Sequence, residues 1–79
     1  MIRIVFGIHD TVKDECLKYA QLCKGTLGAY VPKPGENEKY HIVDVFFDNL
    51  NDANSFIYRC NNRFGLYFYL KEMNQIWIT

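Results

Sequence analysis

The most constraining feature of this sequence is a change of hydrophobic period between residues 40 and 60. Over Tyr40–Phe47 the residues have the composition and the two-residue alternation of a β-strand. After a cluster of Asn and Asp residues at 48–52, apolar residues recur at the spacing of a helix, which Asn49 or Asn51 would cap and residues 61–63 would end. The stretch therefore predicts a strand that leads directly into a helix. The apolar helical stripe consists of Ala53, Phe56, Ile57 and Cys60.

A second unit of the same kind is predicted at the start of the chain. Residues 2–8 alternate, with isoleucines and Phe6 on one side, and this pattern indicates a strand with one strongly apolar side. Asp10 or Thr11 is expected to cap a helix over residues 12–24, and Gly25 to end it. The inward residues of this helix are expected to be Val12, Cys16, Leu17, Ala20 and Cys23.

Shorter alternations predict three more strands, over residues 26–31, 64–70 and 75–79. Residues 32–39 are expected to form a polar loop, in which Pro34 and Gly35 suit the centre of a type II turn. Residues 71–74 are expected to form a hairpin turn. The chain, residues 1–79, thus predicts a single domain with the order strand, helix, strand, strand, helix, strand, strand.

This order predicts an α+β fold, the ferredoxin-like plait βαββαβ, with an extra C-terminal edge strand. Right-handed crossovers would place both helices on one face of a mainly antiparallel sheet, so each strand would have a helix-covered side and an open side. On the covered side we expect Ile2, Ile4, Phe6, Leu27, Ala29, Val31, Val43, Val45, Phe47, Leu66, Phe68 and Ile76. On the open side we expect Arg3, Val5, Tyr30, Tyr40, Ile42, Asp44, Phe46, Tyr67, Tyr69 and Trp77.

The expected open side is unusually rich in aromatic and aliphatic residues for a surface that no helix covers. An exposed patch of this kind is typical of a protein-binding or dimer surface. The alternative is that cross-strand aromatic pairs only stabilise the sheet, or that the C-terminal hairpin covers them. We expect the contact surface to consist of Arg3, Tyr30, Tyr40, Ile42, Phe46, Tyr67, Tyr69 and Trp77.

One segment resembles a known family. Val45-Phe46-Phe47-Asp48, followed by Asp52-Ala53 and Phe56-Ile57, resembles the third strand and second helix of an RNA recognition motif. The resemblance implies the same plait for the whole chain. Aligned on Val45 and Phe47, the base-stacking positions of that family fall on Ile42, Asp44 and Arg3, and its leading basic residue on Tyr40. The resemblance therefore implies the fold and not the stacking of bases.

Size and charge limit the function classes. The chain has 79 residues, 49% of them hydrophobic, so it predicts a folded core rather than disorder. Nine Lys and Arg residues balance nine Asp and Glu residues, and the formal net charge of +0 gives no field that would attract nucleic acid or anionic lipid. A domain of this size is marginally stable, and a partner or a second copy would add stability.

The sequence also predicts a cytoplasmic location. Arg3 interrupts the first apolar run and no cleavage site follows it, so no secretory signal is expected. No apolar run approaches the roughly 20 residues of a membrane span. Cys16, Cys23 and Cys60 contain no Cys-x-x-Cys pair, and we expect them to be buried as small hydrophobic residues in a reducing compartment.

Signatures of catalysis and metal binding are missing from the sequence. His9 and Asp10 are adjacent, so their side chains would point apart, and helix capping explains Asp10. His41 is expected to be an ordinary histidine at a strand end. The sequence contains no glycine-rich phosphate loop, no nucleophile with its base and acid, and no Cys/His metal spacing. We therefore expect no enzyme activity, no cofactor and no metal.

These observations predict a small protein-binding module that acts through the aromatic side of its sheet, alone or as a homodimer. In size and composition it is similar to viral inhibitors, encoded by phages or mobile elements, that block bacterial defence complexes; this step is analogy. The alternative is a single-stranded nucleic-acid-binding domain that uses the same side. There, bases would stack on Tyr30, Tyr40, Phe46 and Trp77, and phosphates would contact Arg3, Lys33, Lys39 and Arg63.

Overall fold

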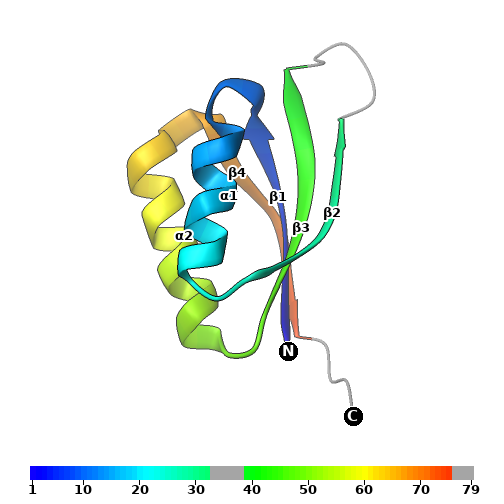
Figure 1. Cartoon of the computed structure of the whole chain (residues 1–79), viewed down its shortest axis with the longest axis vertical. Coiled ribbons are helices and arrows are strands. Elements are labelled where there is room, and N and C mark those ends of the chain that lie inside the picture. Colours follow the sequence, from blue (N-terminus) through cyan, green and yellow to red (C-terminus); the bar gives the residue numbers. More distant parts are fainter. Residues whose placement is uncertain (33–38, 76–79) are drawn as a thin grey trace.

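Two helices pack on one side of a four-stranded antiparallel sheet (Figure 1). This computed structural model describes residues 1–32 and 39–75. The predicted α+β class, with both helices on one side of the sheet, is confirmed. The elements are β1 (Ile2–His9), the short 3-10 helix η1 (Asp10–Val12), α1 (Lys13–Leu22), β2 (Thr26–Pro32), β3 (Tyr40–Phe47), α2 (Leu50–Phe64), the 3-10 helix η2 (Gly65–Tyr67) and β4 (Phe68–Gln75).

The strand order is β2-β3-β1-β4, so β1 and β3 are central and β2 and β4 form the edges. β1 pairs antiparallel with β3 on one side and with β4 on the other. The backbone hydrogen bonds of β1 are therefore divided between β3 and β4, the strand farthest from it along the described chain.

Helix α2 follows its sequence pattern closely and extends one residue beyond the expected end. The Asn49 side chain caps it by accepting a hydrogen bond of 2.9 Å from the backbone N–H of Asp52. Phe64 was predicted to lie in a strand, but it ends the helix and is buried, because it continues the apolar stripe one turn beyond Cys60. Gly65 then stops the helix with a φ of 55°.

Helix α1 begins and ends with different residues than expected. His9 acts as the cap of η1, because its Nδ1 accepts a hydrogen bond from the backbone N–H of Thr11 at 3.2 Å. After Leu22 the chain turns at Lys24, which has a φ of 64°, and the N–H of Gly25 donates to the carbonyl of Ala20. The left-handed residue at the helix end is thus a lysine, and the predicted glycine follows it.

Strand β2 contains a bulge that reverses part of the predicted alternation. Its pairing with β3 shifts between Leu27 and Ala29, so Gly28 is an extra residue. Beyond the bulge every side chain changes side. Ala29 and Val31 therefore lie on the open side and not in the core, whereas Tyr30 lies on the helix-covered side. Leu27 stays on the covered side but is 51% exposed at the sheet edge.

The C-terminal part also differs from the prediction. Residues 71–74 lie within β4 and do not form a turn, and the pairing with β1 shifts at Lys71. Leu66, expected in the core, is 94% exposed in η2. Residues 76–79, which include Ile76 and Trp77 of the predicted extra strand, lie outside the described residues.

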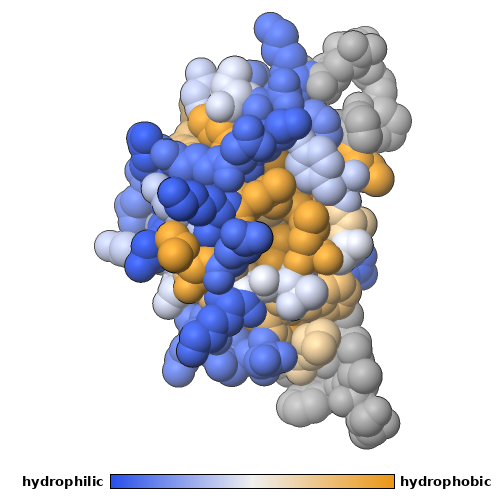
Figure 2. All heavy atoms as spheres, in the orientation of Figure 1, coloured by the Kyte–Doolittle hydropathy of each residue, from blue (hydrophilic) through white to orange (hydrophobic). Residues whose placement is uncertain are grey.

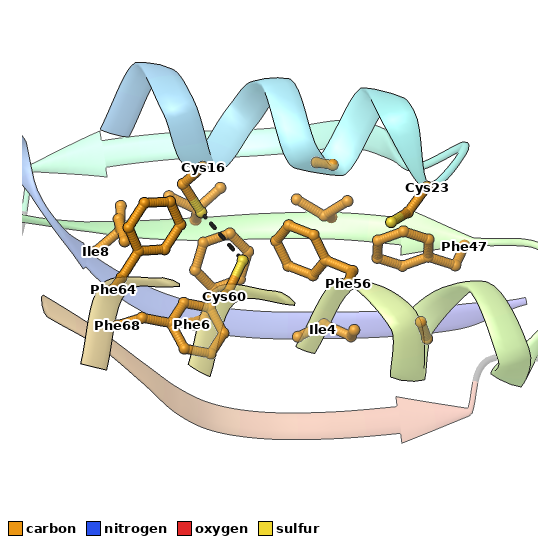
Figure 3. Packing of buried hydrophobic residues seen from close by; sticks show 14 of the residues in the cluster. Ile4, Phe6, Ile8, Cys16, Cys23, Phe47, Phe56, Cys60, Phe64 and Phe68 are labelled. Atoms are coloured by element: carbon orange, nitrogen blue, oxygen red, sulfur yellow. Dashed lines mark hydrogen bonds between the residues drawn. The ribbon is translucent and has the colours of Figure 1, made fainter. Parts of the chain in front are cut away.

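The core lies between the helices and the covered side of the sheet (Figure 3). The Phe56 ring from α2 contacts Phe6 and Phe47, with ring centroids 5.3 and 5.4 Å apart, and Phe68 lies 5.2 Å from Phe6. Burial of each such side chain contributes about 1.5 to 3 kcal/mol. Burial is confirmed for the expected core residues Ile2, Ile4, Phe6, Val43, Val45, Phe47 and Phe68. None of the helices described is long and apolar enough to cross a membrane.

Candidate functional site

The side of the sheet opposite the helices is largely apolar and aromatic, and we call it the open face. Paired residues of antiparallel strands point to the same side, so the register defines its members. Tyr40, Ile42, Phe46 and Tyr69 are partly exposed, and Val31 is 49% exposed. Among the side chains that the structure describes, the open face consists of Arg3, Val5, Gly7 and His9 from β1, Thr26, Ala29 and Val31 from β2, Tyr40, Ile42, Asp44 and Phe46 from β3, and Tyr69 from β4.

An ion pair lies on the two central strands of the open face. Arg3 on β1 and Asp44 on β3 are diagonal neighbours, because Arg3 pairs with Phe46 and Val5 with Asp44. The Arg3 Nε lies 2.8 and 3.1 Å from the two carboxylate oxygens, and an Nη lies 2.9 Å from one of them. This bidentate geometry is the strong form of an ion pair. The Arg3 and Asp44 side chains are 35% and 17% exposed, so the pair is partly desolvated yet contributes no net charge.

Two aromatic rings of the open face lie flat across glycines. A Cβ atom on Gly7 would come within 2.1 Å of the Tyr69 ring, and one on Gly28 within 2.5 Å of the Phe46 ring. Any other residue at these two positions would push the ring away from the backbone. The glycines therefore let both rings lie close to the backbone of the sheet.

A cluster of four rings closes the end of the open face where β1 ends. The His9 ring lies 5.1 Å from Tyr40 and 4.9 Å from Tyr67, and Tyr40 lies 5.8 Å from Tyr69. His9 Nδ1 is also 2.8 Å from the Thr11 hydroxyl oxygen. The imidazole is therefore held by capping and by ring contacts. Tyr67 belongs to η2 and not to a strand, but its half-exposed ring extends the aromatic surface of the open face.

Tyr30 was predicted to lie on the contact surface, but it lies on the helix-covered side of the sheet. Its ring stacks on His41 at 4.5 Å on the covered side, and the Lys13 Nζ lies 5.5 Å from its centroid. The neighbouring Tyr30 raises the pKa of Lys13 above its ordinary value. The His41 Nδ1 lies 3.9 Å from an Asp10 carboxylate oxygen. Trp77, also predicted as a contact residue, lies outside the described residues.

The thiols lie inside the core, away from the open face. Cys16 on α1 and Cys60 on α2 are fully buried with their sulfur atoms 3.8 Å apart (Figure 3). Contact with Cys16 and burial raise the pKa of the Cys60 thiol far above its ordinary value. Cys23 is buried as well, and burial raises its pKa. In the parts of the chain that the structure describes, no three His, Cys, Asp or Glu side chains are grouped so that they could hold a metal ion.

The helical side offers a more polar surface. In Figure 2 the helical layer is largely hydrophilic, and hydrophobic atoms gather in a band along the seam between α1 and β2. Two adjoining hollows of about 320 and 490 Å³ share Tyr58 and Arg59 as lining residues. Tyr58 is 72% exposed, and no feature of the sequence distinguished it. Because Asp52 lines one hollow beside Arg59, both signs of charge meet there, and the hollows are less suited to an apolar contact than the open face.

No protein-family model matches the chain, and no curated protein sequence is detectably similar to it.

Proposed function

We propose that this chain is a small, non-enzymatic module of the cytoplasm that binds another protein through its open face. The observation that carries the proposal is the flat aromatic surface around the neutralised Arg3–Asp44 pair. Tyr, Phe and Arg are enriched in protein interfaces, where tyrosine and arginine often supply most of the binding energy. By analogy in size and composition, the module acts as a viral or mobile-element inhibitor of a defence complex. Its fold is the ferredoxin-like plait, with which the strand order β2-β3-β1-β4 agrees.

The geometry favours a protein partner over single-stranded nucleic acid. Proteins that bind single-stranded nucleic acid combine stacking rings with a positively charged groove along the phosphates, and the formal net charge of +0 does not provide such a field. The Arg3 guanidinium contacts Asp44 instead of facing outward as a phosphate ligand would. Arg63, a second residue considered for phosphate contact, pairs with Glu15 at 3.1 Å on the helical side.

The proposal is tested by replacing two side chains of the open face. We expect a Tyr40→Ser, Phe46→Ser double variant to fold but to bind its partner protein much more weakly than the wild type does. An interface residue of this kind contributes about 2 kcal/mol, which is roughly a 30-fold change in affinity. Each variant is immobilised, exposed to bacterial lysate, and its bound proteins are quantified by mass spectrometry.

The matched control is Tyr58→Ser, because Tyr58 is more exposed but lies on the helical side. At least one protein should be retained by the wild type and by this control, and be lost from the double variant. Equal retention by all three would contradict the proposal. Strong, salt-sensitive binding of mixed oligonucleotides by the wild type alone would instead support the nucleic-acid alternative.

A further inference from the structure

We infer that the open face binds a second copy of this chain, in a two-fold dimer that places Arg3 of each copy over Asp44 of the other. This inference rests on the proposed function, because it assigns a second copy to the same protein-binding surface. In such a dimer the two sheets would pack face to face in two layers, with the helices on the outside, an arrangement known from packed sheets.

The charges of the open face are complementary to those of a second copy. A two-fold axis that lies in the interface between Arg3 and Asp44, perpendicular to the line joining them, exchanges the two positions. The guanidinium of one copy then faces the carboxylate of the other, so four alternating charges meet at the centre of the interface. An unrelated partner would need its own matching pair at this place, whereas a second copy supplies it by symmetry.

The net charge of the whole chain also permits self-association. Identical chains normally repel one another through their shared net charge, and a formal net charge of +0 removes this repulsion. The same neutrality does nothing to attract a strongly acidic or basic partner.

The shape and the area of the open face suit a weak dimer. Because the Tyr69 and Phe46 rings lie across Gly7 and Gly28, the face is level enough for another sheet to pack against it. Four strands about 4.8 Å apart and about 26 Å long cover roughly 500 Å². Two such faces bury at most about 1,000 Å², which is the lower limit for specific interfaces. The dimer is therefore expected to be weak, with a dissociation constant in the range of roughly 1 to 100 µM.

The test reverses one charge of the Arg3–Asp44 pair at a time. Arg3→Glu leaves two acidic residues at the centre of the face, and Asp44→Arg leaves two basic ones. Sedimentation velocity is measured over about 1 to 300 µM, the range that brackets the expected affinity. Wild type should sediment as a monomer–dimer equilibrium. Each single variant should dimerise at least about tenfold more weakly, because like charges face each other. An equimolar mixture of the two variants should restore a dimer, since an acidic face then meets a basic one.

A second pair of variants covers the case in which either charge variant fails to fold by circular dichroism. Ile42→Lys adds a charge to the open face without altering the ion pair, and Tyr58→Lys adds the same charge to the helical side. Only the first should abolish the dimer.

Three results would overturn the inference: a wild type that is monomeric throughout, folded single variants that dimerise as tightly as wild type, or a mixture that stays monomeric. A monomeric wild type whose open-face variants still lose a captured protein would overturn self-association and leave the proposed function standing.

Discussion

The two sides of one sheet differ in how their apolar residues contribute to the molecule. On β3, Val43, Val45 and Phe47 are buried beneath the helices, whereas Ile42 and Phe46, which alternate with them, stay partly exposed. Both sets are strongly apolar, so composition does not explain the difference. What differs is a second layer: helices fill the space above the covered side, whereas no helix or strand of the described residues packs over the open face. Stability is therefore concentrated on one side, and apolar surface for association on the other.

The largest expected contrast is between two adjacent phenylalanines. Phe47→Ser should reduce the free energy of unfolding by about 3 to 5 kcal/mol, because it leaves a cavity beside Phe56 and buries a hydroxyl. Phe46→Ser should cost only about 1 kcal/mol, because its ring is solvated on one side. Urea denaturation at low protein concentration measures both. Equal losses would mean that both sides of the sheet are equally covered.

The same substitution at two glycines should sharpen the contrast. In Gly25→Ala the new methyl group meets Phe47 and Val45 at 2.8 Å, and these core side chains have no room to move, so a loss of about 1 to 3 kcal/mol is expected. In Gly7→Ala the methyl group meets only the outer atoms of the Tyr69 ring, which can swing away from the sheet. We expect a change within about 1 kcal/mol there. Thermal unfolding of the two variants checks this, and a Gly7→Ala as costly as Gly25→Ala would contradict it.

The smallest expected effect is the response of the covered side to alkaline pH. The pKa of Cys60 is raised in the folded state from an ordinary value of 9.0, so its contribution to stability is complete below pH 9 and is lost as pH rises above it. From pH 9 to 10 this thiol alone should lower the free energy of unfolding by about 1 kcal/mol. Urea denaturation at both pH values, for wild type and Cys60→Ala, isolates the effect as a shallower pH dependence in the variant. Identical pH dependence would contradict the assignment.

Elements whose signals are local could be predicted from the sequence. The alternation of β1 and β3 and the Asn49 cap of α2 each depend on residues within one segment, so both central strands and the second helix were placed correctly. For the same reason Tyr40, Ile42 and Phe46 were assigned to the correct side of the sheet. The extension of α2 had a signal that was not used, because Phe64 continues the stripe four residues after Cys60 and a glycine follows it.

Features that depend on pairing between distant segments could not be predicted. The bulge at Gly28 is a mismatch between β2 and β3, and a residue without a side chain gives no periodic signal of its own. Because of the bulge, Val31 lies on the open face, where Tyr30 had been predicted. The Arg3–Asp44 ion pair needs the register of two strands 41 residues apart, which the sequence does not contain in readable form.

The central position of β1 also governs how the chain reaches its fold. Ile2 pairs with Phe47 and with Gln75, so β1 completes its backbone hydrogen bonds only after β4, more than 60 residues further along the chain, has been synthesised. Such long-range pairings slow folding, because an extended segment must be ordered before they form. Both edges of this apolar strand are unpaired until β3 follows, and one edge stays unpaired until β4 follows, which offers a template for aggregation between neighbouring chains. The placement that makes β1 the most protected strand of the native protein makes it the most vulnerable segment during biosynthesis.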